Sequence, residues 1–255
     1  MQKRPFVLSG GGCRGFAHLG AVKAFQEEDI YPSEIAGTSA GSIAGAFLAS
    51  GFTPDEIRDL FVDKLKMNML AWNGFKMGMV SMKNIASFLK KNMRYKNIED
   101  LPVPFYVTAT NFINGRQTVF DKGDIVEIIT AASSIPILFP PVFIEGIPFV
   151  DGGVSNNLPI EPFINKKDEV ISIYVNPIKL FSPEEKPMEL MDRTLHLIHR
   201  EMTGRAAEGC FLYLEPSELK GFGLFDIPRI PDIFEVGYRY TKELLKDKKL
   251  VKAVP

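Results

Sequence analysis

Residues 37–41 form a G-x-S-x-G sequence with Ser39 at its centre. The apolar residues before it predict a short strand, and the small residues at 40–50 predict a helix. A serine between a strand and a helix lies on a sharp turn that lifts its hydroxyl clear of the backbone, and the flanking glycines, Gly37 and Gly41, let the chains approach closely. The helix also directs its free N–H groups at the serine. The pattern predicts a nucleophile, although it is also compatible with a turn that has no chemistry.

A second glycine-rich turn, the glycine loop, follows the strand predicted at residues 6–8 and precedes a helix predicted at 16–28. It consists of Gly10, Gly11, Gly12, Cys13, Arg14 and Gly15. Consecutive glycines can turn several backbone N–H groups toward one developing negative charge, so the loop is a candidate oxyanion hole. Consecutive strands are usually neighbours in a parallel sheet, which would set the loop beside Ser39. Arg14 would support an anionic head group or the loop, or else lie in solvent.

The same six residues match G-x-G-x-x-G, a pattern of dinucleotide-binding loops. Such a site also needs an acidic residue about 20 positions further on, at the end of the second strand. Here the second predicted strand ends in Gly37-Thr38-Ser39, and Glu34 lies before it. The oxyanion hole is therefore the favoured interpretation, and a nucleotide-binding module is the alternative from another class.

Asp151 follows a predicted hairpin strand and is followed by Gly152 and Gly153. Taken alone, Asp-Gly-Gly is typical of a turn. In the presence of the Ser39 motif and the glycine loop, Asp151 instead becomes a candidate functional residue.

The elements around these motifs predict the fold class. Strand, helix, strand and helix follow one another from residue 6 to residue 50, which is typical of a parallel sheet covered by helices. Hairpins are predicted at Asn114-Gly115 and Glu145-Gly146, a strand at 170–175, and helices at 190–207 and 232–248. Without repeats or a linker, we expect one α/β domain over residues 1–255, with a mostly parallel central sheet flanked by helices.

Composition narrows the class of protein. Hydrophobic residues make up 45% of the 255 residues and charged residues 24%, which excludes intrinsic disorder. Lys and Arg total 30 against 31 Asp and Glu, so the basic excess of a nucleic-acid binder is missing. Two cysteines cannot form a disulfide framework, and neither a signal peptide nor an apolar run of about 18 residues is recognised, so we expect a cytoplasmic protein.

Four motifs stand together in one order: LSGGGCRGFAHLG at 8–20, GTSAGS at 37–42, ASSIP at 132–136 before FPP at 139–141, and DGG at 151–153. In these motifs and their order the sequence resembles the patatin-like phospholipases, most closely over residues 5–160. The resemblance implies a three-layer sandwich, a dyad of Ser39 and Asp151, and an oxyanion hole from the glycine loop. It also implies hydrolysis of lipid acyl esters with no metal or organic cofactor.

The predicted activity is that of a serine-dependent lipid acyl hydrolase: a phospholipase A, a lysophospholipase or a carboxylesterase. The nearest alternative is an α/β-hydrolase with a Ser-Asp-His triad, because Ser39, Asp151 and His196 or His199 follow that fold's chain order. Against it, only 38 residues precede Ser39, which leaves little room for the strands that come first in that fold.

Three weaker signals concern the surroundings of the site. Five of the ten methionines lie from Met67 to Met82, which fits a lid, a core segment, or a surface in transient contact with a membrane. Residues 222–234 are a second candidate loop over the site. His196 and His199 share a helix face but have no third ligand nearby, so no metal is predicted. The sequence does not specify the oligomeric state.

Overall fold

The computed structural model describes residues 1–64, 71–72 and 80–246. The strands are β1 (Gln2–Leu8), β2 (Ile30–Thr38), β3 (Ala71–Trp72), β4 (Val80–Ser81), β5 (Phe105–Asn111), β6 (Gln117–Phe120), β7 (Val142–Ile144), β8 (Ile147–Asp151), β9 (Ile171–Ile173) and β10 (Leu212–Leu214). The helices are α1 (Phe16–Gln26), α2 (Ala40–Ala49), α3 (Pro54–Lys64), α4 (Lys83–Asn92), α5 (Ile125–Ala132), α6 (Pro187–Ala207) and α7 (Ile230–Lys246).

The central sheet has eight strands in the order β10-β9-β1-β2-β5-β8-β7, with β6 also paired to β5. The strands from β10 to β5 run parallel to one another, whereas β6 and β8 pair antiparallel with β5, and β7 pairs antiparallel with β8. The prediction of a mostly parallel sheet is confirmed, and so is the predicted parallel pairing of β1 with β2. The glycine loop and Ser39 therefore leave the same edge of the sheet.

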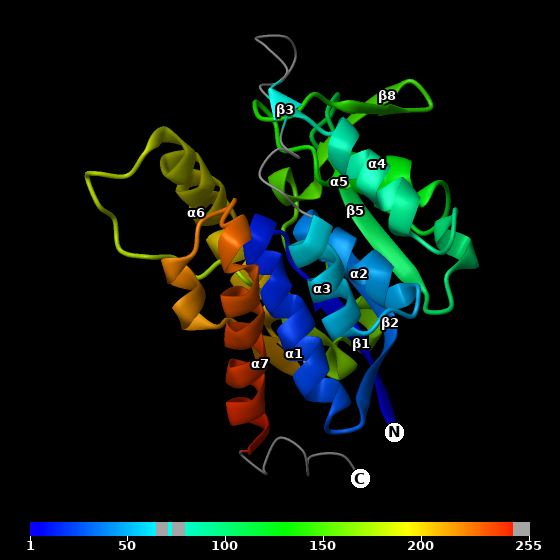
Figure 1. The fold of residues 1–255 in the computed structure, drawn as a ribbon, viewed down its shortest axis with the longest axis vertical. Coiled ribbons are helices and arrows are strands. Elements are labelled where there is room, and N and C mark those ends of the chain that lie inside the picture. Colours follow the sequence, from blue (N-terminus) through cyan, green and yellow to red (C-terminus); the bar gives the residue numbers. More distant parts are fainter. Residues whose placement is uncertain (65–70, 73–79, 247–255) are drawn as a thin grey trace.

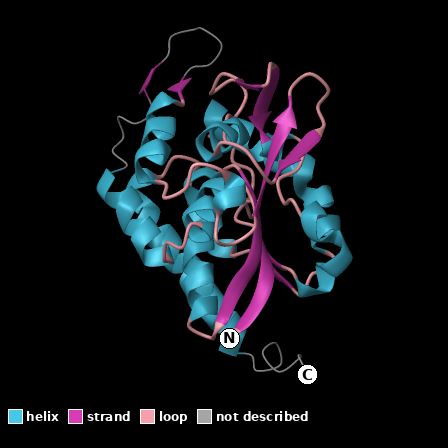
Figure 2. Ribbon diagram, turned by 90° about the vertical axis from the view of Figure 1, so that its right-hand side faces the viewer, coloured by secondary structure: helices cyan, strands magenta, loops and turns pink. Residues whose placement is uncertain are grey.

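Strand β1 shows why helices must cover both faces of the sheet. Its side chains alternate, so Phe6 and Leu8 enter a large core that α1, α2, α5 and α7 complete, whereas Val7 enters a smaller core with Leu158 and Phe163. Figure 2 shows helices on both sides of the strands. This arrangement confirms the expected α/β architecture.

Most of the predicted elements are confirmed, including both hairpins. Strand β10 and helix α4 were not predicted. Strand β1 begins four residues before the prediction because Gln2 to Arg4 pair with residues 30–32 of β2. Arg4 is buried there, with its guanidinium 3.5 Å from the centre of the Phe211 ring. The predicted loop at 222–234 is wrong from Ile230, where α7 begins. Most of the segment from Met67 to Met82 lies outside the described residues.

Within the described ranges, no helix is both long and apolar enough to cross a membrane.

Helices α1 and α7 lie side by side (Figure 1). Their backbones approach closely because a glycine stands on each: a Cβ on Gly20 would overlap the carbonyl oxygen of Phe234, and one on Gly237 would overlap that of Ala17. The contact matters for the site because the glycine loop leads directly into α1.

We expect Gly20→Ala to lower the free energy of unfolding by roughly 1–3 kcal/mol, because the added methyl group must push α7 away. The matched control is Gly204→Ala in α6, where nothing lies within 4 Å of an added Cβ. That change should raise stability by about 0.5–1 kcal/mol through helix propensity alone. Urea unfolding monitored by circular dichroism measures the free energy of unfolding of both variants. Equal changes in this free energy would contradict the close approach of α1 and α7.

Candidate active site

Ser39 occupies the turn between β2 and α2, with φ 51° and ψ −122°. This strained backbone is stabilised by close packing that only glycine permits on either side. A Cβ on Gly41 would overlap the carbonyl oxygen of Leu8, and one on Gly37 would lie 2.5 Å from the carbonyl oxygen of Gly41. The turn therefore has the geometry expected of a strand–helix elbow.

Strand register brings Asp151 to the level of Ser39. Thr38, the last residue of β2, pairs with Thr108 of β5, and the next residue of β5, Ala109, pairs with Asp151 of β8. The acid and the serine thus lie at one height on either side of β5. Because β8 runs antiparallel to β5, it starts opposite the end of β5 and runs back along it, so that its last residue, Asp151, lies opposite Ala109.

The two side chains are in direct contact. The Ser39 hydroxyl donates a hydrogen bond to Asp151 Oδ2 over 2.6 Å, and Asp151 Oδ1 accepts from the Gly153 N–H over 2.7 Å. Both residues are buried, with 7% of Ser39 and 4% of Asp151 exposed. Gly152 must be a glycine because a Cβ there would overlap the carbonyl oxygen of Thr108.

The last residue of α5 and the segment after it bind the backbones of both Ser39 and Asp151. The Ser39 N–H donates to the carbonyl of Ala132 over 3.2 Å, and the Asp151 N–H donates to the carbonyl of Ser134 over 2.9 Å. Two neighbouring carbonyls therefore fix the spacing of the serine and the acid. This gives a structural role to the Ala132–Pro136 part of the sequence pattern.

Burial raises the pKa of Asp151 to about 6, because a carboxylate loses its hydration there. The hydrogen bonds from Ser39 and Gly153 act in the opposite direction, since they stabilise the charged form, but they are the smaller effects. A carboxylate with this pKa is a stronger base than an ordinary aspartate and is still ionised at neutral pH.

The glycine loop lies against the serine: a Cβ on Gly10 would be 3.0 Å from the Ser39 Cβ, and one on Gly15 would be 2.7 Å from that of Ala40. Three of its amides are already engaged. Gly10 donates to Asn157 Oδ1, Cys13 to the carbonyl of Leu224, and Arg14 to the carbonyl of Gly11.

The two central amides of the loop, those of Gly11 and Gly12, have no hydrogen bond within the part of the chain that the structure describes. They are the donors that an oxyanion could use. Gly12 has φ 57°, a left-handed conformation that favours glycine. Cys13 lines the neighbouring cavity, and burial raises the pKa of its thiol to about 12, so it stays protonated.

Three side chains form hydrogen bonds to the backbone of Ser9 and Gly10 and so fix the start of the glycine loop, a role that the sequence analysis did not predict for them. Asn157 accepts the Gly10 N–H over 3.1 Å, and Asn176 donates to the Gly10 carbonyl over 2.7 Å. His18 Nε2 lies 2.8 Å from the Ser9 carbonyl, so it carries the proton of that hydrogen bond. Asn157 stands six residues after Asp151, and this link couples the loop to the acid.

Arg14 is buried rather than solvated. Its guanidinium binds both oxygens of Asp192 in α6, at 2.9 Å each, and also donates to the carbonyl of Phe222 over 3.3 Å. The arginine therefore connects the glycine loop to α6. Sequence reasoning did not find Asp192, because nothing in a helical sequence marks which acid will face a loop 178 residues away.

Two cavities meet at Ser39. One is an apolar cavity of about 130 Å³, lined mainly by side chains of α2, α3, α4 and the 224–227 segment, with Phe61, Phe88 and Phe139 among them. The other is a junction cavity of about 40 Å³ that is lined by Asp151 of β8 and by Met191, His196 and His199 of α6. The hydroxyl is thus open to an apolar wall and to a more polar one.

The histidines do not join Ser39 and Asp151. In the described chain no imidazole makes a hydrogen bond to either residue, although His196 and His199 line the junction cavity. Burial lowers the pKa of His18 and of His196 to about 4, and it also lowers that of His199. Among the described residues no cluster of three metal-binding side chains is found.

The comparisons with known proteins agree with this fold. The patatin-like phospholipase family model matches residues 6–164, more than half of the chain, so the chain belongs to this family. A lysophospholipase NTE1 of Coccidioides immitis is 28% identical over 94% of this chain, and an uncharacterized NTE family protein of Mycobacterium bovis is 28% identical over 67% of it. The chain spans 17% of the first relative and 48% of the second.

Solved structures share the architecture at low identity. VipD from Legionella pneumophila superposes with a TM-score of 0.59 at 15% identity, over 96% of this chain and 67% of that one. Full-length ExoU, in complex with SpcU from Pseudomonas aeruginosa, gives a TM-score of 0.51 at 16% identity, over 99% of this chain and 53% of that one. These similarities show the fold.

Gly12→Ala should lower the kcat of ester hydrolysis by roughly 100- to 1000-fold, the usual loss for one oxyanion donor. The Cβ would overlap the Leu224 carbonyl oxygen and would force the backbone out of φ 57°, so the amides of the loop would turn away. The matched control is Gly115→Ala, which has φ 71° but open space around it. The control should lose some stability and keep its kcat; equal kcat values for the two variants would refute the donor role of the loop.

The kcat/KM for a soluble ester should fall as the pH drops through about 6, because protonated Asp151 cannot accept the serine proton. One unit below the midpoint, the rate should be about a tenth of its plateau value. A stopped-flow pH series measures this profile. A midpoint near 4, the ordinary range of an exposed aspartate, would contradict the proposed state of Asp151.

Proposed function

We propose that this chain hydrolyses the acyl esters of lipids, as a phospholipase A, a lysophospholipase or a related carboxylesterase, through a dyad of Ser39 and Asp151. The observation that carries the proposal is the 2.6 Å hydrogen bond between Ser39 Oγ and Asp151 Oδ2, beside two unengaged glycine amides. A hydroxyl held against a buried base can lose its proton directly to that base.

The proposed reaction has two halves. Ser39 Oγ attacks the ester carbonyl while its proton passes to Asp151 Oδ2, and the amides of Gly11 and Gly12 bind the oxyanion. The intermediate collapses when Asp151 returns this proton to the departing alcohol, which leaves an acyl group on Ser39. Water then gives a proton to Asp151 and attacks the acyl carbon, and the second collapse releases the fatty acid and restores the serine hydroxyl.

The surroundings support a lipid rather than a small polar ester. The apolar cavity opens at Ser39 and offers aromatic and aliphatic walls to an acyl chain. The name of the Coccidioides relative supports lysophospholipids among the substrates.

The two alternatives find less support. A triad would place an imidazole between the serine and the acid, where these side chains instead touch. A dinucleotide would need the open face of the glycine loop, where the Leu224 carbonyl receives the Cys13 N–H over 2.9 Å.

A fluorophosphonate probe tests the assignment, because it forms a bond to an activated serine. We expect intact-mass and peptide analysis to place one adduct on Ser39, with no adduct in Ser39→Ala and a normal adduct in the control Ser217→Ala, which alters an exposed serine. Asp151→Asn should reduce turnover as fully as Ser39→Ala.

The double variant His196→Asn with His199→Asn separates the dyad from the triad. It should lose less than about tenfold in kcat/KM, whereas loss of a general base costs roughly 100- to 10,000-fold. A folded double variant without activity, combined with a merely impaired Asp151→Asn, would favour the triad.

A further inference from the structure

A polar cavity of about 390 Å³ lies between α6 and the segment at residues 220–226. Asp192, His196 and Leu224 line both this cavity and the junction cavity beside Ser39, so the two are adjacent. Leu224 also lines the apolar cavity. An ester at Ser39 would therefore have apolar walls on one side and this polar cavity on the other, with Leu224 between them.

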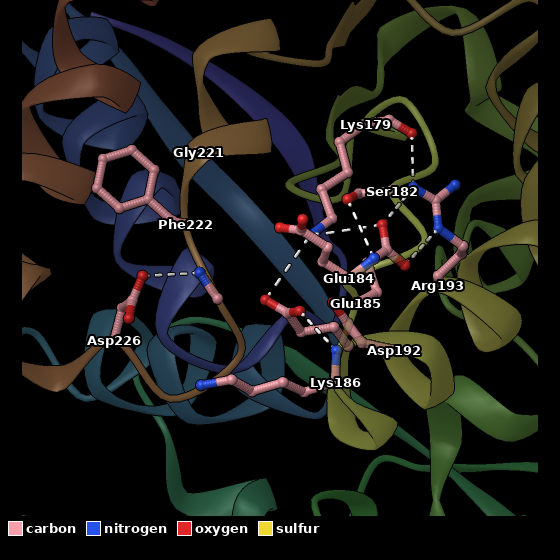
Figure 3. A network of polar contacts seen from close by, with 12 residues as sticks. Lys179, Ser182, Glu184, Glu185, Lys186, Asp192, Arg193, Gly221, Phe222 and Asp226 are labelled. Carbon is pink, nitrogen blue, oxygen red and sulfur yellow. Dashed lines mark hydrogen bonds and ion pairs between the residues drawn. The ribbon is translucent and has the colours of Figure 1, made fainter.

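The carboxylates that line the polar cavity are already engaged with donors. Asp192 binds Arg14 through both oxygens, Glu189 accepts the Lys186 N–H over 3.0 Å, and Asp226 accepts the Gly223 N–H over 2.7 Å. Figure 3 shows Asp226 on one side of the view and the ion pairs of Arg193 and Lys179 on the other. Each of these three carboxylates thus already accepts at least one hydrogen bond from the protein.

The donors are less fully used. Lys220 lines the cavity, is exposed to solvent, and has no hydrogen bond or ion pair with any described residue. Lys179 forms long ion pairs with Glu185 at 3.7 Å and Glu189 at 3.8 Å, and these distances are too long for hydrogen bonds, so its N–H donors are not taken up by the two carboxylates. Arg193 instead binds Glu185 closely, at 2.8 Å, and so forms a fixed part of the wall.

We propose that the polar cavity is the subsite for the leaving group of the substrate and that it selects a leaving group bearing a phosphate, with Lys220 and Lys179 as its donors. The inference rests on the proposed function and adds the position of the head group. A wall with spare ammonium donors and engaged carboxylates matches a phosphate, which has only acceptor oxygens when ionised.

The test compares two substrates with the same acyl chain, a 1-acylglycerol and the corresponding 1-acylglycerol 3-phosphate, both presented in the same detergent micelles. They differ only in the phosphate, so the ratio of their kcat/KM values isolates its recognition. Lys220→Ala should lower the ratio of phosphorylated to neutral substrate roughly 10- to 150-fold, the loss of one charge-assisted hydrogen bond. Asp226→Asn should raise the ratio, because it removes a negative charge from the wall.

The control is Lys122→Ala, which removes an exposed lysine that lines none of these cavities and should leave the ratio unchanged. An unchanged ratio in Lys220→Ala, or an equal fall in Lys220→Ala and Lys122→Ala, would overturn the subsite. Failure of the proposed function looks different: the unaltered protein would hydrolyse neither substrate, or Ser39→Ala would hydrolyse both.

Discussion

A buried carboxylate with a serine hydroxyl as its partner is the constraint around which this structure is organised. Taking Asp151 out of water raises its pKa from 3.8 to about 6, which corresponds to about 3 kcal/mol against the charged form. Because the folded pKa is the raised one, this cost to stability is fully present above about pH 6 and disappears near pH 4, where the unfolded chain is protonated too. The fold must supply that free energy elsewhere, and in the proposed mechanism it gains in return a base in contact with Ser39.

The surrounding fold fixes the backbone of Ser39, Asp151 and the glycine loop through several independent contacts. Strand register sets Asp151 at the level of Ser39, and the carbonyls of Ala132 and Ser134 fix their separation. The glycine loop is held in the same way, since Asn157 and Asn176 bind the amide and the carbonyl of Gly10. Few of these bonds are made by the reacting atoms. These hydrogen bonds restrict the conformational freedom of the backbone, so the Asp151 carboxylate cannot turn toward water. In this sense the site is preorganised.

Local sequence patterns predicted the elements well because the turns that bound them contain glycines, which mark a turn in the sequence alone. This holds for the turn between β2 and α2 and for both hairpins. Ser39 and the glycine loop were identified as candidates because each lies in a short glycine-containing motif, and Asp151 because an Asp-Gly-Gly sequence accompanies those two motifs. Asn157, Asn176 and Asp192 were not found, since their roles depend on neighbours more than a hundred positions away. Six loop residues were expected to form the oxyanion hole, but the amides of three of them make other hydrogen bonds. Local sequence patterns could not predict this, because acceptors such as the Leu224 carbonyl lie far away in the sequence.

The central claim is that Asp151 itself gains and loses the proton of Ser39. Infrared difference spectroscopy between acid and neutral pH tests it most directly, because a protonated carboxyl has a carbonyl stretch that a carboxylate and an imidazole lack. We predict that one such band appears with a midpoint near pH 6, is missing from Asp151→Asn, and persists in the His196→Asn, His199→Asn double variant. A band that is unchanged in Asp151→Asn, or a carboxyl of Asp151 that titrates near pH 4, would contradict the account.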